Sequence, residues 1–93
     1  MTNLDLKDNK IFNLRPLSGL YNLTGLTLSQ NEISDLRPLS DLNNLTRLEL
    51  SENEISNIKP LSDLNKLDYL SLSENPVEDT YCPVQSASVC AFE

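Results

Sequence analysis

The apolar residues of this chain recur with a period of 22 residues, without an insertion or a gap. In each period, leucines alternate with polar residues over a short stretch such as Leu26-Thr27-Leu28, and alternation with period two predicts a β-strand. A second stretch spaces its leucines by three, as at Leu36 and Leu39, which predicts a 3₁₀ or single helical turn. One strand and one turn per period predict a solenoid in which each repeat is a coil.

Rows of 22 residues place like residues above one another in successive columns. The two columns that define the strand are Leu4, Leu26, Leu48 and Leu70, and then Leu6, Leu28, Leu50 and Leu72. Because equivalent strands of successive coils stack side by side, we expect a short parallel sheet on the concave face and short helical turns on the convex face. The fold class predicted here is an α/β solenoid.

The most regular polar column consists of asparagines, namely Asn9, Asn31, Asn53 and Asn75. An inward-facing Asn offers two donors and one acceptor, which can satisfy backbone groups where the chain bends away from the strand. We therefore interpret the column as a structural ladder and favour this role over a polar binding groove.

The row reads L-x-x-L-x-L-x-x-N-x-I-x-x-L-x-P-L-x-x-L, which is a leucine-rich-repeat pattern. The segments 23–31 (LTGLTLSQN) and 33–39 (ISDLRPL) resemble the 22-residue bacterial repeats of internalins and of internalin-like proteins of cyanobacteria. The resemblance spans residues 1 to about 77, and it implies that the concave face recognises a protein. The chain departs from that family in one respect, because it carries no helical N-terminal cap.

The regular pattern ends at Pro76, which predicts repeats over residues 1–76, about 3.5 coils, and a capping segment over residues 77–93. The last coil of a solenoid exposes its apolar interior and needs a cover. Five residues of the segment are expected to supply that cover: Val77, Tyr81, Val84, Val89 and Phe92. The tail also resembles the ending of cyanobacterial internalin-like chains.

Cys82 and Cys90 both lie in the capping segment, with seven residues between them. A disulfide would stabilise the segment by roughly 2–3 kcal/mol through loop closure and would favour an extracytoplasmic location. Two reduced, partly buried thiols are the alternative, and the location is otherwise unknown. No metal site and no cofactor are expected, because the chain has no His and only two thiols.

The first row has no such cover. Its apolar residues lack a neighbour on one side: Leu4, Leu6, Ile11, Leu14, Leu17 and Leu20. Phe12 and Tyr21 add aromatic surface where later rows carry Ser or Asn. Three interpretations stay open: the chain is the C-terminal part of a longer array, two copies meet end to end through an unpaired edge strand, or the two aromatic residues fold over the end. A self-associating end would use Phe12, Leu14, Leu4 and Tyr21.

Strand residues that point away from the core line the concave face. Arg47 and Tyr69 are adjacent members of one outward column, and both residue types are favoured at binding hot spots. The residues expected to join them in a partner-binding surface are Thr27, Glu49, Ser71, Glu52 and Glu74. The carboxylates predict a basic partner, and four strands span only about 15 Å, which suits a peptide or a small domain. The alternative is a solvated charged face without a partner.

Arg15, Arg37 and Lys59 occupy the position where an N-cap Ser, Thr or Asp would be usual, and each precedes a Pro. We therefore expect helical turns that are short and weakly capped.

The composition and net charge of the chain disfavour several classes of function. Nineteen residues are Leu and none is Trp, which suits one core slot filled repeatedly. The net charge of −7 disfavours nucleic acid and anionic lipid surfaces as partners, and no apolar run is long enough to insert into a membrane. Without a His or a glycine-rich phosphate loop, no enzyme activity is expected.

Three functions compete at this stage. The leading hypothesis is a non-catalytic protein-interaction module that binds through the concave face. The structural alternative is an assembly element that self-associates end to end, as a homodimer. The third is a truncated or consensus-like array without an activity of its own, which the near-identity of rows 45–53 and 67–75 keeps open.

Overall fold

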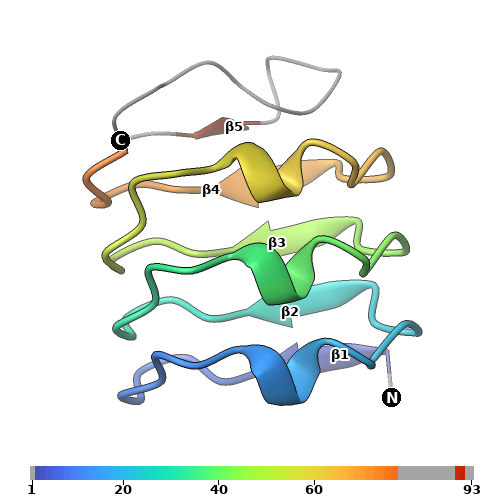
Figure 1. Cartoon of the computed structure of the whole chain (residues 1–93), viewed down its shortest axis with the longest axis horizontal. Coiled ribbons are helices and arrows are strands. Elements are labelled where there is room, and N and C mark those ends of the chain that lie inside the picture. Colours follow the sequence, from blue (N-terminus) through green and yellow to red (C-terminus); the bar gives the residue numbers. More distant parts are fainter. Residues whose placement is uncertain (1, 78–89, 92–93) are drawn as a thin grey trace.

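The computed structural model describes residues 2–77 and 90–91. It is a stack of coils, and the first three each have one three-residue strand and one 3₁₀ turn (Figure 1). The elements are β1 (Asn3–Asp5), η1 (Arg15–Leu17), β2 (Gly25–Thr27), η2 (Arg37–Leu39), β3 (Arg47–Glu49), η3 (Lys59–Leu61), β4 (Tyr69–Ser71) and β5 (Cys90–Ala91). We number the coils by their strands, so that coil 1 is residues 3–24, coil 2 residues 25–46, coil 3 residues 47–68, and coil 4 begins at residue 69.

The strands form one parallel sheet in the order β1-β2-β3-β4-β5. Its register advances by one repeat per strand, so that Leu4 pairs with Leu26, and Leu26 with Leu48. This confirms the predicted leucine-rich-repeat arc. The fifth strand was not expected, because Cys90–Ala91 lies outside the repeat pattern and joins the sheet beside β4.

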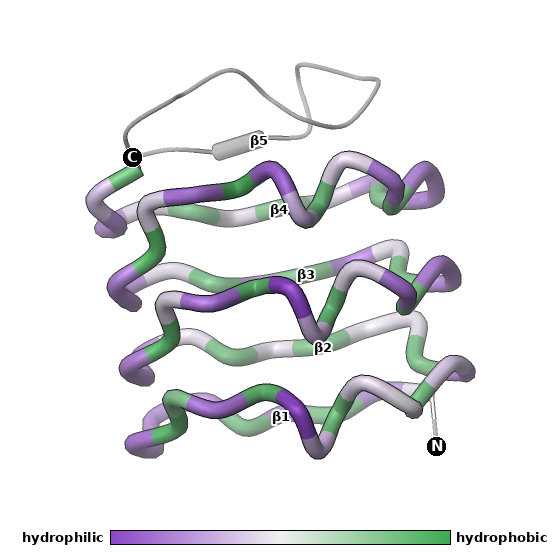
Figure 2. Tube along the Cα trace, viewed as in Figure 1, coloured by the Kyte–Doolittle hydropathy of each residue, from purple (hydrophilic) through white to green (hydrophobic). Residues whose placement is uncertain are grey.

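The core is a column of leucines and isoleucines inside the coils. Leu28, Leu48, Leu50 and Leu70 are completely buried, as are Ile33 and Ile55 beyond the asparagine column. Figure 2 shows the repetition directly, because hydrophobic and hydrophilic segments recur at the same places in successive coils. The leucines of the inner coils are covered by their equivalents in the coils on either side, and a coil therefore depends on its neighbours for burial.

The asparagine side chains hydrogen-bond to backbone groups and connect successive coils. Asn53 Nδ2 donates to the carbonyls of Leu28 (3.0 Å), Leu50 (2.9 Å) and Ser51 (3.2 Å). Its Oδ1 accepts the Ile33 amide at 3.1 Å. Asn31 and Asn75 repeat this arrangement. The column is thus a set of bridges between coils.

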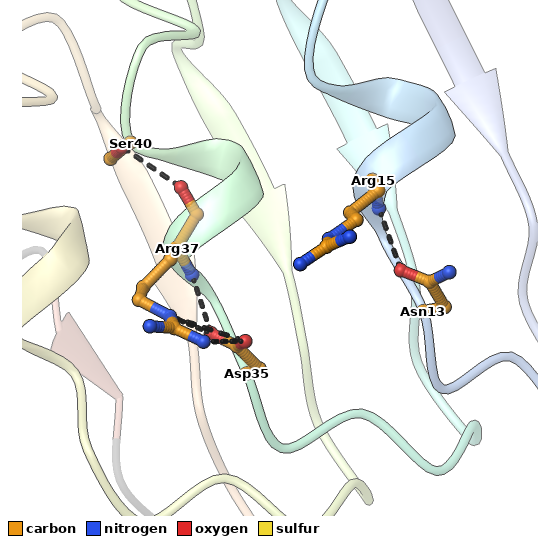
Figure 3. Close-up of polar contacts among 5 residues, drawn as sticks. All are labelled: Asn13, Arg15, Asp35, Arg37 and Ser40. Atoms are coloured by element: carbon orange, nitrogen blue, oxygen red, sulfur yellow. Dashed lines mark hydrogen bonds and ion pairs between the residues drawn. The ribbon is translucent and has the colours of Figure 1, made fainter.

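The turns are short, as expected, and their N-cap residues Leu14, Leu36 and Ile58 make no side-chain cap hydrogen bond. Arg15, Arg37 and Lys59 are the first residues of the turns rather than their N-caps, and the side chain two positions earlier accepts each of their amides. The acceptors are Asn13 Oδ1 at 3.1 Å, Asp35 Oδ1 at 3.0 Å and Asn57 Oδ1 at 3.1 Å. Figure 3 shows the first two of these caps. Asn and Asp favour such local bonds to a backbone amide two residues on, and this repeated signal was overlooked.

One residue in each strand-to-turn corner adopts a left-handed backbone. These residues are Asp8, Gln30, Glu52 and Glu74, with φ between 58° and 61°. The conformation is disfavoured for residues with a Cβ by roughly 1–2 kcal/mol. Each lies directly before an asparagine of the repeated column, and three of these asparagines, Asn31, Asn53 and Asn75, bridge successive coils.

The predicted capping segment lies largely outside the described residues. Of its five apolar residues, only Val77 is described, and it is half-buried against the core. The Cys82 side of the predicted disulfide also lies outside the described residues, so the pairing with Cys90 stays a prediction, as does the boundary between residues 76 and 77.

Candidate functional site: the concave sheet surface

Two outward columns of the sheet form the candidate site. Parallel registration aligns Asn3, Gly25, Arg47 and Tyr69 in one column. The next column contains Asp5, Thr27, Glu49 and Ser71. Since adjacent parallel strands lie about 4.8 Å apart, side chains of neighbouring coils make direct contact across this surface.

Contacts across three strands hold Arg47 in one place. Its guanidinium lies over the Tyr69 ring, with Cζ 4.5 Å from the ring centroid. The same group pairs with Glu49 Oε2 at 3.4 Å, and that oxygen accepts the Thr27 hydroxyl at 3.2 Å. The pair is exposed and therefore contributes little to stability. Together with the Tyr69 ring, the pair restricts the conformations open to the arginine side chain.

A shallow hollow lies beside this network. Gly25 forms its floor, and its lining includes Asn3, Asp5, Thr27 and Arg47, with a volume of about 210 Å³. A Cβ at residue 25 would meet the Asn3 side-chain oxygen. Gly25 therefore leaves room for the Asn3 side chain beside the hollow. It is the only glycine in this column, and that is the feature of the sequence that marks the hollow.

Carboxylates border the network along the strand-to-turn corners. Glu52 and Glu74 are exposed at adjacent left-handed positions, and Gln30 donates to Glu52 Oε2 at 3.3 Å. The strands and their corners thus carry more acidic than basic groups around Arg47.

The other predicted binding residues differ in accessibility. Tyr69 is 38% exposed, whereas Ser71 is only 8% exposed and offers a partner little surface. Thr27 is half-buried beneath the Glu49 carboxylate. Ser29 and Ser51, two positions beyond Thr27 and Glu49, are also partly enclosed, and Ser51 donates to the buried Ser29 hydroxyl at 3.0 Å.

The first coil presents a second, apolar surface. Phe12 is 70% exposed and Tyr21 58% exposed, and Leu4 is half-buried. Leu14, which we expected to be open on one side, is only 1% exposed. That expectation was wrong, because Leu14 directly precedes η1 and its side chain is buried in the core with the leucines of the next coil.

Metal ligands, membrane-spanning helices and shifted pKa values bear on what else the described residues could do. Within residues 2–77 and 90–91, no group of three or more potential ligands is placed to hold a metal ion. In that same part of the chain no helix has the length and apolarity needed to cross a membrane. Bonding to Arg37 lowers the pKa of Asp35 to about 2, but this exposed pair caps η2 and lies outside the strand columns.

Comparison with known proteins agrees with the repeat pattern. A family model described as leucine-rich repeats in two copies matches residues 43–81. The internalin InlF of Listeria monocytogenes is 35% identical, with a TM-score of 0.83, over 85% of this chain and 23% of that protein. A second Listeria monocytogenes internalin is 39% identical, with a TM-score of 0.77, over 95% of this chain and 38% of that protein.

A leucine-rich-repeat protein of Leptospira interrogans is 33% identical, with a TM-score of 0.76, over 84% of this chain and 21% of that protein. No curated protein matches the chain. The chain spans less than two thirds of each of these structures. The likeness extends over the repeats, in sequence as well as in backbone. The chain therefore folds as a leucine-rich-repeat solenoid that is similar to those of the internalins.

Proposed function

We propose that the chain is a non-catalytic module that binds a protein or peptide on its concave face, with Arg47 and Tyr69 as the central contacts. The observation that carries this proposal is the arrangement in which Tyr69 and Glu49 together fix the Arg47 guanidinium. Tyr and Arg are the residue types that most often dominate binding energies. An exposed arginine contributes little to the stability of the fold. Its restricted side chain loses less entropy when it binds a partner.

The proposed partner is basic. Glu49, Glu52 and Glu74 surround the centre with carboxylates, and opposite charge steers association. The left-handed corners support this choice, because Glu at such a position is less stable than Gly or Asn would be. Ser71 belongs to the proposed surface only at its margin, since it is nearly buried.

Selection from a random peptide library displayed on phage tests this function. We expect the selected peptides to be enriched in Lys and Arg, and to bind the Arg47→Ala/Tyr69→Ala variant at least about tenfold more weakly, as the loss of a hot spot implies. The matched control is Arg15→Ala, which removes an exposed arginine from η1, outside the strand columns. Equal binding to the concave variant and the wild type would place the site elsewhere.

A second candidate function is self-association through the first coil. The observation in its favour is the exposed aromatic surface of Phe12 and Tyr21, at positions where coil 2 has Ser34 and Asn43. Exposed apolar patches of this kind mark interaction surfaces. The mass of the protein in solution tests it, and a monomer at every concentration would exclude it.

A further inference from the structure

The hollow beside Gly25 lies between two strands whose side chains differ in hydrogen-bonding character. Asn3 and Asp5 line it from β1, and Arg47 lines it from β3. Gly25 and Thr27 belong to β2, the strand between these two. An ionised carboxylate only accepts hydrogen bonds, and a guanidinium only donates them. Asp5 and Arg47 thus give the two sides of the hollow opposite charge and opposite bonding roles.

The β1 side offers two acceptors. A Cβ at Gly25 would meet the Asn3 side-chain oxygen first, so this oxygen lies over the glycine. Asn3 Nδ2 donates to the Thr2 hydroxyl at 3.4 Å, on the side away from Oδ1. Asp5 Oδ1 accepts the Lys7 amide at 3.0 Å, and Asp5 Oδ2 accepts no hydrogen bond from the described residues. Asn3 Oδ1 and Asp5 Oδ2 are therefore available to a ligand.

The β3 side offers donors that are held in place but not all engaged. The Tyr69 ring lies against the guanidinium of Arg47, with its centroid 4.5 Å from Cζ. Stacking leaves the N–H groups accessible, because they lie in the plane of the guanidinium. Among the described residues, this group donates only from Nη2, to Glu49 Oε2 at 3.4 Å. A guanidinium has five N–H donors, so others remain for a ligand.

The size of the hollow suits a single side chain. Its volume is about 210 Å³, which is below the roughly 300–1,000 Å³ of pockets that hold drug-sized ligands. It opens on the concave face, where the proposed peptide would lie. One side chain of that peptide can therefore enter the hollow while the rest of the peptide crosses the sheet.

We propose that the hollow binds the side-chain carboxamide of a Gln or Asn in the peptide on the concave face. This inference rests on the proposed function and specifies one residue of the partner. A carboxamide nitrogen has two N–H donors, and its oxygen has two lone pairs. The nitrogen donates to Asp5 Oδ2 and Asn3 Oδ1, and the oxygen accepts from the guanidinium of Arg47.

Charged side chains fit the hollow less well. A Glu or Asp of the peptide would place its carboxylate against Asp5, and a Lys would place its ammonium against Arg47. The carboxylate has no donor for Asp5, and the ammonium has no acceptor for Arg47. A site that bonds a polar group discriminates against analogues that lack the matching group. The Lys and Arg residues of the proposed partner would instead lie over Glu52 and Glu74.

Synthetic peptides test the carboxamide. Phage-selected peptides that bind the wild type but not the Arg47→Ala/Tyr69→Ala variant should share one Gln or Asn. Versions of the tightest peptide in which Glu, Lys or Leu replaces that residue should each bind the wild type about tenfold more weakly. Isothermal titration calorimetry measures the affinities. Equal affinities would mean that the hollow holds a main-chain amide or no peptide group, and would overturn the inference.

A change of Asp5 should alter this preference. Asp5→Asn keeps an acceptor for the Lys7 amide and removes the charge that opposes a carboxylate. The Glu version should then bind at least as tightly as the carboxamide peptide, because its carboxylate pairs with Arg47. Asp8→Asn is the matched control, since it removes the same charge from the same coil but does not line the hollow. It should keep the preference for the carboxamide.

A change of Gly25 tests the space itself. Gly25→Ala places a Cβ where the Asn3 oxygen lies, so the carboxamide peptide should bind about threefold to tenfold more weakly. The Leu version of the peptide should bind this variant and the wild type alike. Gly19→Ala is the matched control, because a Cβ there meets no atom within 4 Å. Circular dichroism of every variant verifies that the fold is retained.

The outcomes separate this inference from the function on which it rests. Basic peptides that need Arg47 and Tyr69 but show no preference for a carboxamide overturn the inference and leave the proposed function intact. Peptides that bind the Arg47→Ala/Tyr69→Ala variant as tightly as the wild type overturn both. A preference for the carboxamide that persists in Asp5→Asn would contradict the assigned contact with Asp5.

Discussion

Coils 1 and 3 have nearly the same pattern of residues and differ in what surrounds them. In coil 3, Leu50 is fully buried and Asn53 makes four hydrogen bonds. In coil 1, Leu6 is half-buried, and Asn9 is exposed and donates only to the carbonyls of Leu6 and Lys7. The stabilising effect of a repeat residue therefore comes from the coils on both sides of it.

The largest expected effect comes from the core leucines. Leu50→Ala should lower the free energy of unfolding by about 3 kcal/mol or more, because it opens a cavity in a closed interior, whereas Leu6→Ala should cost less than about 2 kcal/mol. Urea denaturation of the two variants measures the difference. Equal losses would show that coil 1 is as well packed as coil 3.

The bridging asparagines should give the next largest difference. Asn53→Ala leaves the Ile33 amide and three carbonyls without this side chain, and should cost about 2–3 kcal/mol, whereas Asn9→Ala should cost less than about 1 kcal/mol. Urea denaturation measures both losses. Hydrogen exchange at the Ile33 amide adds a local measurement, and an unchanged rate in Asn53→Ala would argue against the bridge.

A smaller effect of opposite sign is expected at the left-handed corners. Glu52→Asn should raise the free energy of unfolding by about 0.5–1 kcal/mol, because Asn tolerates φ near 58° better than Glu does. Glu54→Asn is the matched control, since it removes the same charge at a residue without positive φ. Equal changes in thermal unfolding would attribute the gain to charge alone.

The smallest effect concerns the turn caps and depends on pH. Asp35 has a pKa of about 2 in the folded chain, against an ordinary value of 3.8, chiefly through its side-chain bonds to Arg37. A lowered folded pKa stabilises the protein above the unfolded value, and this contribution is lost as pH falls from about 5 to about 2. Asp35→Asn should keep the cap, as Asn13 and Asn57 do, and should weaken this pH dependence.

Thermal unfolding between pH 7 and pH 2 measures that change, which should be small because the pair is exposed. Asp41→Asn removes a carboxylate without an Arg two residues away and serves as the control. Identical pH profiles for Asp35→Asn and the wild type would contradict a stabilising ion pair.

The fold was predictable from the sequence because the 22-residue period sets both the strand register and the core. The candidate site was predictable only in part. The column that contains Arg47 and Tyr69 follows from the register, but the stacking of one on the other and the link from Thr27 to Glu49 depend on side-chain conformations. The turn caps at Asn13, Asp35 and Asn57 were visible as a repeat of Asn or Asp, and we misread them.

The sequence by itself determined the number of residues per coil, the inward and outward columns, and the place of the bridging asparagines, because a strict period leaves one way to bury the leucines. The tertiary structure decided how much each repeated residue is enclosed. In the folded chain, Leu14 and Ser71 are buried, Cys90–Ala91 pairs with β4, and Gly25 lines a shallow hollow. These features depend on neighbouring coils, and burial is a property of what lies on either side of a residue.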